Sequence, residues 1–187
     1  MPPLPPPRAE RGFVLVMGMM FMLMCTLLGL AMFRSFGLQE RMAGNTRDKQ
    51  RAFEAAQTAL QYGEWWLRSG ADTTPVACAG VVDGNMVAAM RVCNAALAKP
   101  AQLPWPARVD YQPPAMGVQG GGGVGVGGDI LYQGKPGLQM HYLGLTDGGT
   151  GFLYRVSAFA YGGNADTAAV VQSTYKLTSA VHDLGQE

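Results

Sequence analysis

This chain is poor in charged residues, cysteine and histidine, and each scarcity argues against a class of function. Charged residues make up 14% of the 187 positions, compared with about 25% in typical soluble domains. From Arg34 onward, Lys and Arg balance Asp and Glu, so recognition of nucleic acid through bulk positive charge is not expected. Three cysteines and two histidines are too few and too scattered for a zinc or haem site. The sequence therefore predicts no metal site.

The usual sequence patterns of enzymes are also missing. No G-x-S-x-G or H-E-x-x-H pattern occurs, and neither His141 nor His182 stands beside an obvious nucleophile. Gly123-x-Gly125-x-x-Gly128 formally matches a dinucleotide fingerprint, but it lies in a glycine tract with no clear helix after it. That fingerprint requires a strand before it and a helix after it. No catalytic residue and no cofactor are predicted.

Proline is absent between Pro7 and Pro75, which allows one long helix. Its first part, residues 13–33, holds 21 uncharged and mostly apolar residues. At about 1.5 Å per residue they span about 31 Å, the hydrocarbon thickness of a bilayer. Arg8 and Arg11 precede the span and favour a cytoplasmic N-terminus, with the rest of the chain exported.

The alternative interpretation of this span is a secretory signal peptide. Gly29-Leu30-Ala31 would then serve as the cleavage site. The apolar part of such signals is about 7–15 residues long, which is shorter than the run found here. The helical pattern also continues past the site, which favours a helix that is retained.

Residues 34–69 read as the amphipathic half of the same helix. Gly70, with Pro75 beyond it, marks the end of the helix. Small and apolar residues recur at spacings of three and four, which predicts one apolar face. That face comprises Ala52, Phe53, Ala55, Ala56, Ala59, Leu60, Tyr62, Trp66 and Leu67.

Residues 70–187 read as a small, β-rich head. Segments 152–161 and 167–177 are rich in β-branched and aromatic residues, and the turn at 162–166 predicts a hairpin between them. A third strand is expected at 140–145. Two or three strands are marginal alone, so we expect them to pack on the amphipathic half of the helix. Residues 117–128 are glycine-rich and predict a flexible surface loop.

Two of the three cysteines lie in this head. Cys78 and Cys93, if oxidised, would close a loop of about 15 residues and contribute roughly 3 kcal/mol. An exported head with few charges and many glycines would benefit from that constraint. The alternative is two reduced, buried thiols.

Several short segments together resemble a known family. Arg11-Gly12-Phe13, placed directly before the apolar run, resembles the class III leader of type IV prepilins. The segments that follow resemble PilX-type minor pilins, and a moderate resemblance returns near the C-terminus. These segments are Glu40-Arg41-Met42-Ala43-Gly44-Asn45, Arg47-Asp48, Ala52-Phe53-x-Ala55-Ala56, Tyr161-Gly162-Gly163-Asn164 and Gln172-Ser173-Thr174-Tyr175.

The resemblance implies how the N-terminus is processed. Residues 1–12 would be a leader that a prepilin peptidase removes by cutting after Gly12. Phe13 would then become an N-methylated terminus, and the apolar helix would be retained. The implied fold is α+β and pilin-like, with one long N-terminal helix packed on a small antiparallel sheet.

One departure from the family pattern concerns Met17. Most pilins carry Glu at the fifth mature position, and counting from Phe13 that position is Met17. In the family this Glu is thought to pair with the terminal ammonium of a neighbouring subunit. A subunit that lacks it fits best at the pilus tip, where no subunit lies ahead.

The resemblance therefore implies a non-catalytic minor pilin that primes type IV pilus assembly and sits in a tip complex. Its expected partners are other minor pilins, the major pilin, a tip adhesin and the inner-membrane assembly platform. It would span the inner membrane before assembly and then enter the pilus. The alternatives are a minor pseudopilin of type II secretion, a tip adhesin or DNA-binding pilin using Trp105, Tyr111 and Tyr132, and a single-pass membrane protein with no pilus role. The short head favours the pilus over the secretion system.

Overall fold

The computed structural model describes residues 12–120, 122–123, 125 and 131–178. The expected leader, residues 1–12, lies outside this part of the chain except for Gly12. Positions 121, 124 and 126–128 of the glycine-rich segment also lie outside it. The chain divides into two compact units, residues 1–44 and 45–187, and each is described by itself.

Helix α1 runs from Phe13 to Arg68, one residue short of the predicted end at 69. In the first unit, the described residues after Gly12 are all helical. In the second unit the helix ends where the backbone N–H and the hydroxyl of Ser69 both donate to the carbonyl of Trp66, at 3.1 and 2.7 Å. Gly70 follows with a φ of 77°, a left-handed conformation that glycine adopts without steric cost.

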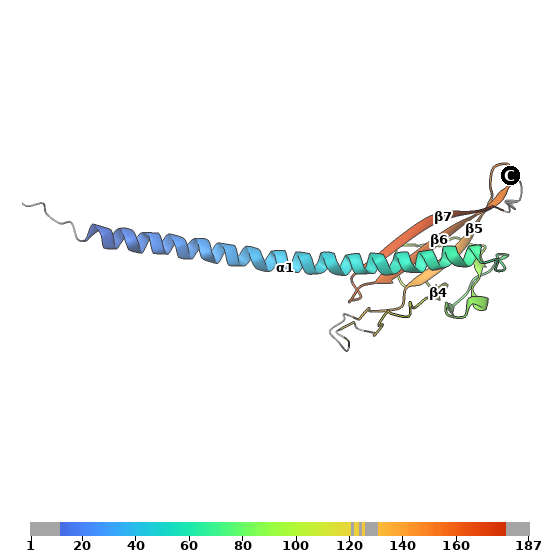
Figure 1. The fold of residues 1–187 in the computed structure, drawn as a ribbon, viewed down its shortest axis with the longest axis horizontal. Coiled ribbons are helices and arrows are strands. Elements are labelled where there is room, and N and C mark those ends of the chain that lie inside the picture. The colour runs from blue at the N-terminus through green and yellow to red at the C-terminus, as the bar shows by residue number, and fades with distance from the viewer. Residues whose placement is uncertain (1–11, 121, 124, 126–130, 179–187) are drawn as a thin grey trace, which may run out of the picture. The chain divides into compact units, whose positions relative to one another are not determined.

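The second unit contains a seven-stranded sheet centred on β5 (Figure 1). On one side β5 pairs with β6, and β6 pairs with β7, both antiparallel. On the other side β5 pairs with β3 in parallel and with β4 antiparallel, and the outer strands β1 and β2 add in parallel. The strands are β1 (Pro75–Val76), β2 (Val81–Asp83), β3 (Val92–Cys93), β4 (Arg108–Asp110), β5 (Gly137–Leu145), β6 (Gly151–Tyr161) and β7 (Ala168–Thr178), with a 3₁₀ helix at Val87–Ala89.

The predicted α+β class and the C-terminal hairpin are confirmed. Strand β6 begins one residue before the predicted segment 152–161, and β7 lies one residue beyond the predicted 167–177. The third predicted strand, 140–145, is the end of the longer β5. The sheet is mixed rather than purely antiparallel, because four short strands from residues 75–110 join it.

The core of the head forms where the last turns of α1 lie across the sheet (Figure 1). Four alanines of the helix are buried against the strands: Ala52, Ala55, Ala56 and Ala59. Gly63 also lies on this face, where a Cβ atom would come within 3.0 Å of Val156 Cγ1. Small residues thus let the helix backbone approach the sheet closely, and Trp66 and Leu67 complete the buried face.

The prediction for Phe53 is wrong, since this side chain is 44% exposed. Phe53 is the next residue after the buried Ala52, and one residue along a helix turns the side-chain direction by about 100°. Phe53 therefore lies at the edge of the apolar face rather than within it.

Candidate functional site

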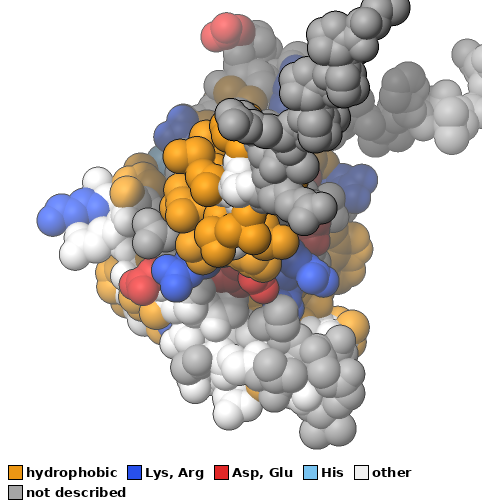
Figure 2. All heavy atoms as spheres, turned by 90° about the vertical axis from the view of Figure 1, so that its left-hand side faces the viewer, with side chains coloured by type: hydrophobic (Ala, Val, Ile, Leu, Met, Phe, Trp, Pro, Cys, Tyr) orange, Lys and Arg blue, Asp and Glu red, His pale blue; other side chains and the backbone are white. Residues whose placement is uncertain are grey.

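The first candidate surface is the apolar part of α1, residues 13–33. Its described large side chains are exposed, Phe13 by 62% and Met17 by 58%. Figure 2 looks onto this end of the molecule, and hydrophobic side chains gather there. By length and composition, α1 is the one helix among the described residues that could cross a membrane. Thr26 donates its hydroxyl to the carbonyl of Leu23 at 2.8 Å, so this hydroxyl has a partner within the helix, as an apolar surrounding requires.

The predicted processing residues lie where this helix begins. The carbonyl of Gly12 accepts the first backbone hydrogen bond, from Val16, at 3.4 Å. Phe13 is the first helical residue, and Met17 follows one helical turn later. The first carboxylate after Phe13 in the sequence is that of Glu40. The apolar segment therefore offers no acidic partner for a terminal ammonium.

The second candidate site is a junction between α1 and the β6–β7 turn, inside the second unit. The Asp48 carboxylate accepts hydrogen bonds from the backbone N–H of Gly163 at 2.6 Å and from Asn164 Nδ2 at 2.8 Å. Asn164 also orders its own turn, since its Oδ1 accepts from the N–H groups of Asp166 and Thr167 at 3.0 and 2.8 Å. The turn is thereby fixed internally and fastened to the helix.

Two further polar contacts fasten β7 to the helix, one beside Asp48 and one further along the helix. Lys49 donates from Nζ to the carbonyl of Ala168, and Ser173 donates to Glu64 Oε1 at 2.6 Å. Gly162 is needed for the close approach, because a Cβ at that position would lie 2.6 Å from Asp48 Oδ1. The arrangement holds the last strand on the helix through polar contacts at both ends of the alanine face.

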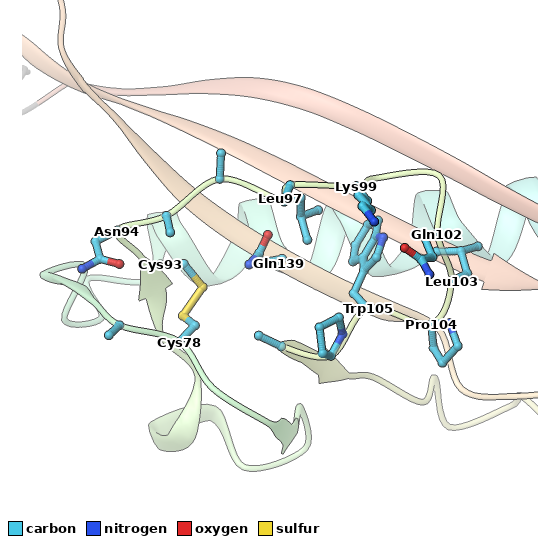
Figure 3. Close-up of a pocket in the computed structure, with 16 residues that line it drawn as sticks. Cys78, Cys93, Asn94, Leu97, Lys99, Gln102, Leu103, Pro104, Trp105 and Gln139 are labelled. Atoms are coloured by element: carbon cyan, nitrogen blue, oxygen red, sulfur yellow. A yellow bond between two sulfur atoms is a disulfide. The ribbon is translucent and has the colours of Figure 1, made fainter.

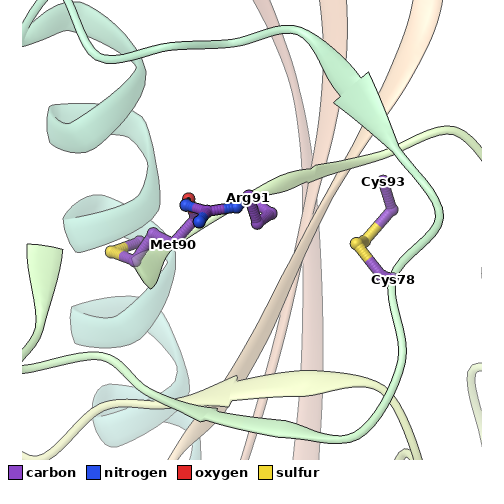
Figure 4. The surroundings of a disulfide bond; sticks show 4 residues. All are labelled: Cys78, Met90, Arg91 and Cys93. Carbon is purple, nitrogen blue, oxygen red and sulfur yellow. A yellow bond between two sulfur atoms is a disulfide. The ribbon is translucent and has the colours of Figure 1, made fainter. Parts of the chain in front are cut away.

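The predicted disulfide between Cys78 and Cys93 is present. It ties the segment after β1 to β3 (Figure 4). On the other side of β3, Met90 is buried in the core, and Arg91 donates to the carbonyls of Ala88 and Met90 at 2.7 and 2.8 Å. Both ends of the short β3 are therefore fixed. Cys25 carries a free thiol and is exposed.

The three aromatic residues considered for ligand binding are engaged within the head. Trp105 is buried and packs edge-on against Phe159, with ring centroids 4.8 Å apart. Tyr111 stacks on Tyr62 at 4.0 Å, and the Tyr132 ring lies 4.8 Å from the Arg51 guanidinium carbon. These contacts favour a structural role for all three.

Tyr62 connects the helix to the loop after β2. Its hydroxyl donates to the carbonyl of Gly84 at 2.7 Å. Burial, reinforced by the nearby Tyr111 and Asp83, raises the pKa of Tyr62 above its usual value. Burial likewise raises the pKa of Tyr161, against the opposing effect of Arg108. Both phenols therefore stay neutral over a wider pH range than free tyrosine.

Among the described residues, no group of three His, Cys, Asp or Glu side chains could hold a metal ion.

The N-terminal region is similar to a known protein family. Residues 11–61 match the family model described as PilX N-terminal. This N-terminal match supports the resemblance to PilX-type minor pilins. No match to this chain was found among curated proteins or among solved structures. The match supports a minor pilin role in a type IV pilus, and the apolar helix fits a membrane-anchored pilin.

The junction joins two segments that each resemble PilX-type minor pilins and lie far apart in the sequence. Arg47-Asp48 lies within the PilX-type region, and Tyr161-Gly162-Gly163-Asn164 lies about a hundred residues beyond its end. The structure brings Asp48 onto Gly163 and Asn164. Each segment can be recognised in the sequence, but nothing in the sequence predicts a contact between them. The available signal was a glycine pair next to asparagine in a hairpin turn, which could receive a carboxylate at close range.

Proposed function

We propose that this minor pilin primes type IV pilus assembly and occupies a tip complex with other minor pilins. Its role there is structural rather than catalytic. The major pilin, a tip adhesin and the inner-membrane assembly platform are its further partners. Before assembly the helix stays in the inner membrane with its N-terminus in the cytoplasm, and a prepilin peptidase cleaves between Gly12 and Phe13.

Met17 carries the tip part of this proposal. A repeating pilin subunit must offer a carboxylate to the terminal ammonium of the subunit ahead, because an unpaired ion in an apolar core costs several kcal/mol. Position 17 is methionine, and no acidic residue precedes Glu40 in the helix. Such a subunit is best tolerated where no ammonium ahead needs a partner, which is the tip.

Small residues along the apolar segment support close helix association during assembly. Membrane helices pack where small residues let backbones approach, and Gly18, Gly29 and Ala31 are the candidates. Beyond the adjacent residues and the nearby helix backbone, a Cβ on Gly18 or Gly29 would meet no described atom within 4 Å. These positions are open to a neighbouring helix.

The proposal is tested by deleting the gene for this protein, restoring it in a complemented strain, and labelling sheared pili with immunogold. The proposal expects few or no surface pili in the deletion strain and label confined to pilus ends in the complemented strain. Normal piliation combined with a defect in protein secretion would instead favour the pseudopilin function. Even labelling along the shaft would contradict the tip placement.

A further inference from the structure

The head contains a cavity that the pilin function leaves without a role. It has a volume of about 540 Å³, within the range of about 300–1,000 Å³ typical of ligand pockets. The segment 94–107 and strand β5 form its walls. Figure 3 shows the Cys78–Cys93 disulfide at one end, Trp105 at the other, and Gln139 of β5 between them.

Gln139 faces away from α1. Its neighbours on the strand, Leu138 and Met140, are buried in the core beneath the helix, and successive side chains of a strand point to opposite faces of the sheet. Gln139 therefore lies on the other face, where it is 92% buried, with 8% of its surface exposed. The cavity lies on this face, at a distance from the alanine surface and from the Asp48 junction.

The side-chain amide of Gln139 has no hydrogen-bond partner among the described residues. Ser157, directly opposite it on β6, instead accepts from Gln172 Nε2 at 3.0 Å. An amide that the rest of the head leaves unpaired keeps both its donor and its acceptor available to a ligand. Its donor and acceptor are accessible from the cavity, since Gln139 lines it.

The walls indicate what kind of ligand would fit. Alanine is the most frequent residue type in the lining, and Lys99 is its only charged side chain among the residues described. Trp105 is a fixed apolar wall, because its indole N–H already donates to the carbonyl of Pro100 at 3.0 Å. No carboxylate is present to hold a cation, and one exposed lysine does not make an anion site.

We propose that this cavity binds an extended, uncharged peptide segment with small apolar side chains, held by Gln139. A carboxamide presents a donor and an acceptor side by side, which matches the C=O and N–H of a peptide backbone, and the alanine walls allow that backbone to approach. A smaller cavity of about 170 Å³ shares Cys78, Cys93 and Gln139 with this one. The larger one has the room for a chain. That the peptide comes from a neighbouring pilus subunit rests on the proposed function.

The binding test uses the full-length protein in detergent micelles and the blocked peptide acetyl-Ala-Leu-Ala-amide, followed by NMR. Saturable shifts are expected for cavity residues. Gln139→Met should weaken binding about tenfold or more, while leaving stability similar because the amide has no partner in the head to lose. Gln172→Met, the same change on the same face outside the cavity, should leave affinity within about twofold. Absence of saturable shifts, or equal affinity in Gln139→Met, would overturn the proposal.

The source of the peptide is tested in piliated cells by placing a photo-crosslinking residue at Leu97, which lines the cavity, and at Thr174 as a control. Crosslinking from position 97 to an uncharged segment of a pilus subunit, identified by mass spectrometry, supports the proposal. A crosslink from position 97 to an uncharged segment of a protein that is not part of the pilus would support the peptide site but contradict the proposed function. Piliation that requires this chain, without crosslinks at position 97 above the control, would refute the peptide site alone.

Discussion

The carboxylate of Asp48 accepts a hydrogen bond at 2.6 Å from the backbone N–H of Gly163, a residue 115 positions further along the chain. A hydrogen bond to an ionised acceptor contributes about 1.5–3 kcal/mol. This contact fastens the turn before the last strand to the helix that crosses the sheet. One carboxylate therefore contributes to holding the last hairpin on the helix.

Replacing Asp48 should destabilise the head. We expect Asp48→Ala to lower the free energy of unfolding by about 1–3 kcal/mol, because the N–H of Gly163 and the amide of Asn164 lose their acceptor. Asp48→Asn, which keeps one acceptor oxygen, should cost less. Urea unfolding of the full-length protein in detergent measures both. Asp166→Ala is the control in the same turn, and an equal loss in that variant would contradict the assignment to Asp48.

Removing the disulfide should also lower stability. Cys78 and Cys93 are 15 residues apart, and closing such a loop contributes about 3 kcal/mol. We expect Cys78→Ser to lose about 2–4 kcal/mol and to reduce piliation through degradation of the protein, whereas Cys25→Ser should have little effect on the head. Without reductant, alkylation should modify only Cys25. Labelling of Cys78 and Cys93 in the untreated protein would show that the bridge is absent in cells.

Maturation should depend on Gly12. We expect Gly12→Leu to block cleavage and pilus assembly, since the prepilin peptidase accepts a small residue there. Gly18→Leu, the same change further along the apolar segment, should leave cleavage intact. Intact mass of the membrane-extracted protein distinguishes the two. A wild-type chain that still begins at Met1, or that begins at Met32, would contradict this processing.

Restoring a carboxylate at position 17 should change where the subunit assembles. Met17→Glu adds an acid near the end of the span, where insertion costs less than the about 2.5–3.5 kcal/mol found at the centre. The variant should therefore still insert, pair with the ammonium of a subunit ahead, and enter the shaft. Immunogold label should spread from the ends along the pili. Met19→Glu places the same charge at the seventh mature position, and equal spreading in that control would remove the special role of position 17.

Alkaline pH should weaken the head through Tyr62. Its pKa is raised in the folded state, so the unfolded chain releases this proton at a lower pH, at about 10. The stabilisation that comes from protonated Tyr62 is complete below that pH. It is lost as the pH rises through the higher pKa of the folded state. Tyr62→Phe should flatten the fall in unfolding free energy above about pH 10, apart from a uniform loss from the missing hydrogen bond to Gly84. If the unfolding free energy of Tyr62→Phe fell as steeply with pH as that of the wild type, Tyr62 would not be the group responsible.

The helix and the hairpin could be predicted because their signals are local. A proline-free run with an alanine face predicts the helix. Two β-branched segments on either side of a glycine-containing turn predict the hairpin, and neither prediction needs the rest of the chain. Strands β1 to β4 contain only two or three residues each, too few for a periodic pattern, and pair with partners far along the chain. The disulfide could be anticipated from two cysteines, whereas their place beside β3 could not.

The polar junction and the cavity needed the folded chain. Asp48 looks like any charged residue of an amphipathic helix until the turn at Gly163 is placed on it. Gly63 reads as a defect in the helix, but it allows Val156 to approach within contact distance. Gln139 occupies an ordinary strand position, and its isolation appears only when Ser157 is seen bonded to Gln172.

The alanine face of α1 has a consequence for how the protein is made. Ala52, Ala55 and Ala56 pack with Ala160 and Ala169 of the last two strands, so the surface that covers them is synthesised roughly a hundred residues after them. Closing so long a loop is entropically costly, and folds built on distant pairings form slowly. If the head is exported as proposed, the alanine face stays uncovered until β7 has crossed the membrane. Chaperones that protect the chain, and proteases that degrade it, would then act in this interval.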